Sequence, residues 1–69
     1  MNEKKINILL VEDEESHTDL IFRSFESTTM PVSLVNTRNL NDARASIAES
    51  VPDLVIVDYI LPDGKGTEL

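Results

Sequence analysis

The sequence predicts an α/β protein with a parallel sheet and the element order βαβαβ. Two nearly continuous apolar runs, at residues 6–11 and 54–57, are typical of strands that are covered on both faces of a parallel sheet. Apolar residues recur at helical spacing in two segments between these runs. Strands that alternate with helices over short connections favour right-handed parallel crossovers.

The first helix is expected from Glu15 to about Ser27. Its apolar residues recur at helical spacing, and acids crowd its start, where the helix dipole favours negative charge. The stripe consists of Thr18, Ile21, Phe22 and Phe25.

A short strand is expected at residues 32–35, where β-branched residues follow the break at Pro31. Asn39 is then suited to cap a second helix over residues 40–50, which Pro52 stops.

The third strand is expected at residues 54–57, or to 58. Beyond it, Pro62, Gly64 and Gly66 predict a loop, and residues 67–69 resemble the first turn of a helix.

Composition limits the classes of function. With 69 residues and 41% hydrophobic content the chain forms one domain at most, and without cysteine it has no disulfide or thiolate metal site. A formal charge of -7 repels phosphate backbones and anionic lipids, so we expect no nucleic-acid or membrane partner. No stretch is long enough for a signal sequence or a membrane span, which predicts a cytoplasmic protein.

Carboxylates follow both apolar runs. Glu12 and Asp13 end the first run, and Asp58 ends the second. Neighbouring parallel strands lie roughly 4.8 Å apart, and ligands of open α/β sheets bind at the carboxyl ends of the strands. We therefore expect these three side chains to converge.

A structural interpretation of the same acids stays open, because acids after strands also cap helices and form turns. Their joint occurrence after two strands of one sheet favours a functional site. Like charges about 4 Å apart repel by on the order of 4 kcal/mol at an effective dielectric of 20, so the cluster predicts a bound cation. Mg²⁺ suits these hard oxygen ligands best, and a carboxylate beside such an ion can act as a nucleophile toward phosphorus.

Two segments, Ile8-Leu9-Leu10-Val11-Glu12-Asp13-Glu14-Glu15 and residues 52–66 with Asp58, Pro62 and Gly66, look like the receiver domain of two-component response regulators. The resemblance implies a flavodoxin-like (CheY-like) doubly wound parallel sheet, truncated after strand three. It also implies phosphorelay signal transduction, in which a sensor histidine kinase phosphorylates the protein in the presence of magnesium.

The resemblance assigns each site residue a role. Asp58 is the phosphoacceptor, Asp13 a metal ligand, and Glu12 the outer member of the acidic pair, which reaches the ion through water. The backbone carbonyl of Ile60 is a further metal ligand. Lys65 stands where the family often has aspartate or serine.

Residues 1–69 correspond to an incomplete receiver domain: strands one to three, two helices and the start of a third. The family's phosphate-binding threonine or serine and its conserved lysine belong to later strands. Their absence predicts that phosphorylation is slow and that the conformational switch is lost. The chain is expected to be a phosphoacceptor and not an enzyme. The strand at residues 54–57 would then be a bare sheet edge, so we expect either a homodimer that forms through this edge or a fragment of a longer chain.

Two other functions compete with this interpretation. A pseudo-receiver, or truncated interaction and dimerisation module, would use the fold without phosphotransfer and would not depend on magnesium. A nucleotide-binding enzyme would need a glycine-rich turn where the acids at 12–15 stand, and these acids repel pyrophosphate. His17 is interpreted as a surface residue, and Arg38 shows no chemistry that the sequence reveals.

Overall fold

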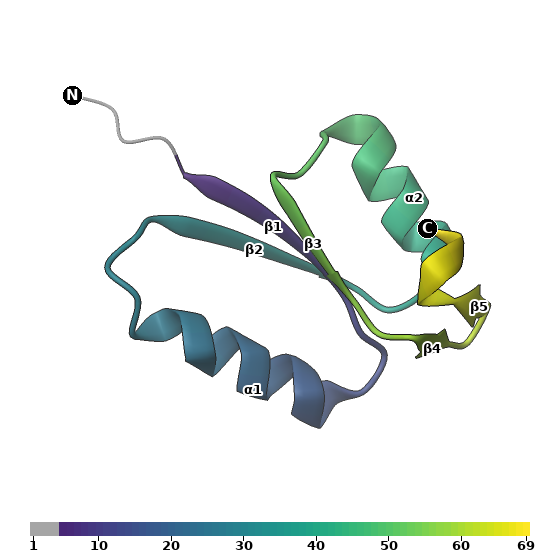
Figure 1. Cartoon of the computed structure of the whole chain (residues 1–69), viewed down its shortest axis with the longest axis horizontal. Helices are drawn as coiled ribbons and strands as arrows, with labels where there is room; N and C mark the ends of the chain where they lie inside the picture. The colour runs from purple at the N-terminus through teal and green to yellow at the C-terminus, as the bar shows by residue number, and fades with distance from the viewer. Residues whose placement is uncertain (1–4) are drawn as a thin grey trace.

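A parallel three-stranded sheet forms the centre of the molecule (Figure 1). The computed structural model describes residues 5–69, so the first four residues of the predicted domain lie outside the described part. The strands are β1 (Ile6–Val11), β2 (Val32–Thr37) and β3 (Leu54–Val57), in the order β2-β1-β3. The predicted βαβαβ order and the parallel pairing are confirmed.

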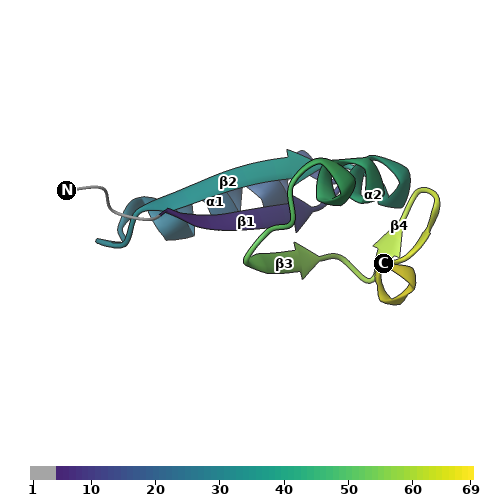
Figure 2. The same cartoon turned by 90° about the horizontal axis from the view of Figure 1, so that it is seen from above.

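Two helices cover opposite faces of the sheet: α1 (Glu15–Glu26) and α2 (Leu40–Glu49) (Figures 1 and 2). The chain leaves β1 for β2 on one side and then crosses over β1 to reach β3 on the other. Right-handed crossovers in these opposite directions place the connecting helices on opposite faces. The side chain of Asn39 accepts a hydrogen bond from the backbone N–H of Asp42, which confirms the predicted cap of α2.

The face that α2 covers holds the apolar core cluster, beside a pocket of about 100 Å³ that Ser46 of α2 and Val35 of β2 help to line. Leu40 and Ala43 of α2 are fully buried, and Ile47 packs against the same cluster. Alternate residues of β1 complete it, because successive side chains of a strand point to opposite faces. The buried members of the cluster are Leu9, Val11, Leu40, Ala43 and Leu61.

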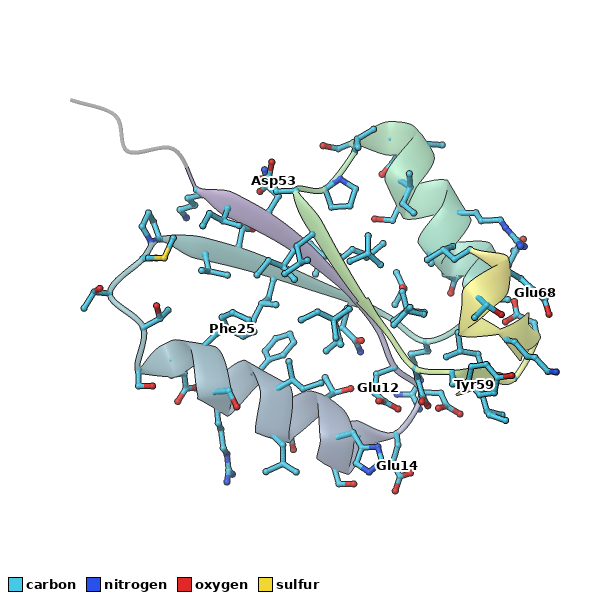
Figure 3. The ribbon with its side chains drawn as sticks, in the orientation of Figure 1. Glu12, Glu14, Phe25, Asp53, Tyr59 and Glu68 are labelled. Atoms are coloured by element: carbon cyan, nitrogen blue, oxygen red, sulfur yellow. The ribbon has the colours of Figure 1, made fainter. Side chains whose placement is uncertain are left out.

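On the face that α1 covers, the buried residues come from β1 and not from the helix: Ile8 is 3% exposed and Leu10 is 1% exposed. None of the twelve residues of α1 is buried, although Phe25 points from the helix toward the sheet (Figure 3). An open groove of about 260 Å³ lies between α1 and β2. Its lining residues are Phe22, Phe25, Glu26, Val32 and Leu34.

The prediction that the strand at residues 54–57 is buried is wrong. Leu54 is 49% exposed and Val57 is 36% exposed. Within residues 5–69 β3 pairs only with β1, so its outer edge has no neighbouring strand. The apolar run belongs to an edge strand that is partly open to water, and the expected bare edge at residues 54–57 is present in the described residues.

Other differences from the predicted elements are local. β2 continues two residues beyond the predicted end because Asn36 and Thr37 pair with Leu10 and Val11. The predicted loop contains a hairpin, β4 (Ile60–Leu61) with β5 (Gly64–Lys65), which turns at Pro62 and Asp63. The predicted helical turn is a 3₁₀ helix, η1 (Gly66–Glu68).

Within the described residues, no helix has both the length and the apolar character that crossing a membrane requires.

Candidate metal centre

Three carboxylates meet at the carboxyl ends of β1 and β3. One carboxylate oxygen from each of Glu12, Asp13 and Asp58 lies within 4.8 Å of the others. The predicted convergence of these side chains is therefore confirmed. Figure 3 shows Glu12 at this end of the sheet, whereas Asp53, which precedes β3, lies at the opposite end.

Backbone hydrogen bonds beyond the strands position two of these acids. The N–H of Glu12 donates to the carbonyl of Thr37 at 2.9 Å, and the N–H of Asp58 donates to the carbonyl of Val11 at 2.9 Å. The parallel ladder thus extends one residue past β1 and β3. Because the central strand binds both neighbours, the backbone amides of Glu12 and Asp58 are anchored to the sheet.

Glu12 is the least accessible member of the cluster. The residue is 7% exposed, and its Oε2 accepts a hydrogen bond of 3.2 Å from the backbone N–H of Glu14. Its Oε1 lies 3.6 Å from Nδ1 of His17, whose side chain is 55% exposed. His17 is thus a surface residue as predicted, but it also lies beside the acidic cluster.

Arg38 makes a contact with Asp13 that the sequence did not predict. Its Nη2 donates a hydrogen bond of 2.9 Å to the carbonyl oxygen of Asp13. Arg38 directly follows Thr37, the residue that pairs with Val11. The pairing of β2 with β1 places Arg38 beside the end of β1, so the contact could be predicted only from the strand order. The Arg38 guanidinium therefore binds the backbone of one of the three acids.

The segment after Asp58 folds back onto it. The N–H of Gly66 donates to the carbonyl of Tyr59 at 2.7 Å. A Cβ atom built on Gly66 would overlap the carbonyl oxygen of Asp58, so only glycine allows this approach. Lys65 is exposed, and its Nζ lies 5.8 Å from the centre of the Tyr59 ring.

Ile60 begins β4 and pairs with Lys65 across the hairpin. Its side chain is 65% exposed. The role of its backbone carbonyl as a metal ligand stays a prediction.

The donor set suits a hard divalent cation. It consists of three carboxylates, one of them nearly buried, and none of these ligands is a nitrogen or sulfur atom. Mg²⁺ is commonly held by one or two carboxylates, with waters and phosphoryl oxygens completing the octahedron. Three acids leave positions for both, and the cation would offset their repulsion.

Comparisons with known proteins add one relative. The chain is 40% identical over 65 residues to the methanogenesis regulatory protein FilR1 of Methanothrix harundinacea (strain 6Ac). The match covers 91% of this chain and 15% of that protein. No family model matches the chain, and no solved structure matches it. Most of this chain is therefore similar to a small part of a regulatory protein.

Proposed function

We propose that this chain is a receiver module of a two-component signalling system that accepts a phosphoryl group on Asp58 from a sensor histidine kinase. The observation that carries the proposal is the meeting of Glu12, Asp13 and Asp58 within 4.8 Å. The strand order β2-β1-β3 is compatible with part of a flavodoxin-like sheet. The similarity to a regulatory protein agrees with a signalling role, and we expect the module to act in the cytoplasm.

Each acid has a separate task in the proposed reaction. A carboxylate oxygen of Asp58 attacks the phosphorus of a phosphohistidine, and the bond from phosphorus to the histidine nitrogen breaks. Asp13 and Asp58 would bind Mg²⁺ directly, the Ile60 carbonyl would add a ligand, and Glu12 would act through water. When bound, Mg²⁺ would neutralise charge on the phosphoryl oxygens.

Calorimetric titration with Mg²⁺ tests the metal site. We expect weak binding by the natural chain and none by Asp13→Asn or Asp58→Asn. Asp19→Asn is the matched control, since it removes the same charge from an exposed position on α1 and should bind Mg²⁺ like the natural chain.

Phosphoacceptance is tested by adding beryllofluoride with Mg²⁺ and recording backbone amide spectra. Shifts at Asp58 and its neighbours, absent in Asp58→Asn, are the expected result. Binding of Mg²⁺ without any response to beryllofluoride would support the metal site but contradict the phosphoacceptor role of Asp58.

The open edge of β3 supports a second candidate, an interaction module that dimerises without phosphotransfer. Leu54 is 49% exposed at this edge, and Tyr59 and Ile60 are exposed just beyond the strand. An edge strand presents unpaired N–H and C=O groups to a second chain. Two copies paired through β3 would satisfy these groups.

Sedimentation of the 69-residue chain tests dimerisation. A dimer that persists in chelator, and that Val55→Pro disrupts, would favour the interaction module, because proline removes a ladder N–H. Pro52 provides the control position, and Pro52→Ala should leave the association state unchanged. A folded monomer at micromolar concentration would exclude this candidate.

A further inference from the structure

Asp63 joins the hairpin to the start of α2. Its Oδ1 accepts a hydrogen bond of 2.7 Å from the backbone N–H of Leu40, and its Oδ2 accepts one of 2.9 Å from that of Asn41. The first amides of a helix lack partners within the helix. Asp63 therefore supplies, from 23 residues away in sequence, partners for two amides of α2.

This contact complements the local cap of the same helix. Asn39 accepts from the N–H of Asp42, whereas Asp63 accepts from the two preceding amides. The hydrogen bond from the Leu40 amide lowers the pKa of the Asp63 carboxyl below its ordinary value, and the bond from Asn41 acts in the same direction. The charged form of Asp63 is thus the form that binds α2.

Packing holds the same segment in place. Leu61 of β4 is 6% exposed and belongs to the core cluster that contains Leu40. Beyond the hairpin, Nη2 of Arg44 donates to the carbonyl of Glu68 at 3.1 Å. The hairpin and η1 are therefore attached to α2 in three ways. The Asp63 carboxylate accepts two hydrogen bonds from amides of α2, Leu61 lies in the same core cluster as Leu40, and Arg44 donates a hydrogen bond to Glu68.

The segment so attached also touches Asp58. Gly66 lies directly against the Asp58 carbonyl oxygen and donates its N–H to Tyr59. Movement of the hairpin away from α2 would carry Gly66 with it. The carbonyl of Asp58 would then lose the neighbour that limits its position.

We infer that Asp63 is a positioning residue, which fastens residues 59–66 to the N-terminus of α2 and thereby holds the backbone of Asp58 for metal binding. The attachment rests on the contacts of Asp63, Leu61, Arg44 and Gly66, and is independent of the proposed function. Its consequence for the metal rests on the proposed function.

Amide exchange tests the fastening without metal. In Asp63→Ala we expect faster exchange at Leu40 and Asn41, on the order of tenfold, because a lost cap frees these amides. We also expect faster exchange at Gly66 and shifted resonances at Asp58. Asp63→Asn keeps one acceptor oxygen and should give a smaller change, and Asp19→Asn should give none. Unchanged exchange at Gly66 in both Asp63 variants would overturn the inference.

Mg²⁺ titration of the same variants tests the consequence for the site. Loss of a residue that orients a ligand typically weakens metal binding by 10- to 100-fold. We expect on the order of tenfold weaker binding in Asp63→Ala, less in Asp63→Asn, and the natural affinity in Asp19→Asn.

The two possible failures are distinct. An affinity within twofold of the natural chain in both Asp63 variants would overturn the positioning role while the metal site stands. Absence of Mg²⁺ binding by the natural chain would overturn the proposed function and the metal role of Asp63 together. The exchange of Gly66 would still show whether Asp63 fastens the hairpin.

Discussion

The two helices differ in how completely their own side chains are buried against the sheet. α2 packs Leu40 and Ala43 into the core cluster, whereas no residue of α1 is buried and an open groove lies between α1 and β2. The hairpin adds Leu61 and Asp63 to the α2 face only. The side chains of α2 are therefore buried more completely than those of α1, and the segment that follows Asp58 packs on the α2 face.

The largest expected effect is a direct test of this difference. Leu40→Ala should lower the free energy of unfolding by about 2–5 kcal/mol, because it opens a cavity among fully buried side chains. Phe22→Ala removes a larger side chain from α1 but should cost only about 1–2 kcal/mol, because that ring is partly in water already. Urea denaturation measures both. Equal losses would mean that the two faces contribute equally.

The second effect concerns the hairpin on the α2 face. Gly66→Ala should lower the free energy of unfolding by about 1–3 kcal/mol, because the new Cβ overlaps the Asp58 carbonyl oxygen and the backbone must shift. The amide resonance of Asp58 should shift with it. Thr67→Ala, one residue along η1, is the matched control and should leave Asp58 in place. An unchanged Asp58 resonance in Gly66→Ala would contradict the close approach.

At the carboxyl ends of the strands we expect a smaller change in the free energy of unfolding, with the opposite sign. Without Mg²⁺, Asp58→Asn should raise the free energy of unfolding by on the order of 1 kcal/mol, because it removes one of three neighbouring negative charges. With saturating Mg²⁺ the natural chain should be the more stable of the two, since only the natural chain is stabilised by binding the ion. Thermal unfolding with chelator and with Mg²⁺ measures both signs. A less stable Asp58→Asn in chelator would show that repulsion is not the dominant force there.

The smallest expected effect is the pH dependence at Asp63. Its pKa is lowered in the folded protein from the ordinary 3.8, so its contribution is present above that pH and is lost as pH falls through the folded value. The carboxyl is exposed to solvent, which limits the size of the effect. Denaturation of the natural chain and of Asp63→Asn across pH 2 to 5 measures it. Identical pH profiles would show that Asp63 does not stabilise the folded state through its charge.

Local patterns predicted the elements of this fold well and its long-range contacts poorly. The apolar runs located β1 and β3, and Asn39 predicted the start of α2 because capping acts within three residues. The convergence of Glu12, Asp13 and Asp58 followed from the rule that parallel strands end at one edge. The apolar run predicted burial of β3 wrongly, because such a run does not reveal whether a strand has one neighbour or two, whereas the resemblance to a receiver domain predicted the bare edge.

Arg38 and Asp63 were beyond the reach of the same reasoning. Arg38 meets a carbonyl 25 residues away, and Asp63 meets amides 23 and 22 residues away. Neither contact has a local sequence pattern. Both depend on the order of the strands and on the path of the hairpin, so they appear only once the chain is folded.

The two glycines of the hairpin region should behave differently in a search for suppressor mutations. A side chain at Gly64 meets the tips of Leu40 and Glu68, which second substitutions can shorten, although its φ of +149° would still disfavour any other residue. A side chain at Gly66 meets the backbone of Asp58, which no substitution can remove. A suppressor of a Gly66 variant must therefore separate the backbones of residue 66 and Asp58, and the suppressors recovered would map the residues that set the distance between the hairpin and the proposed phosphoacceptor.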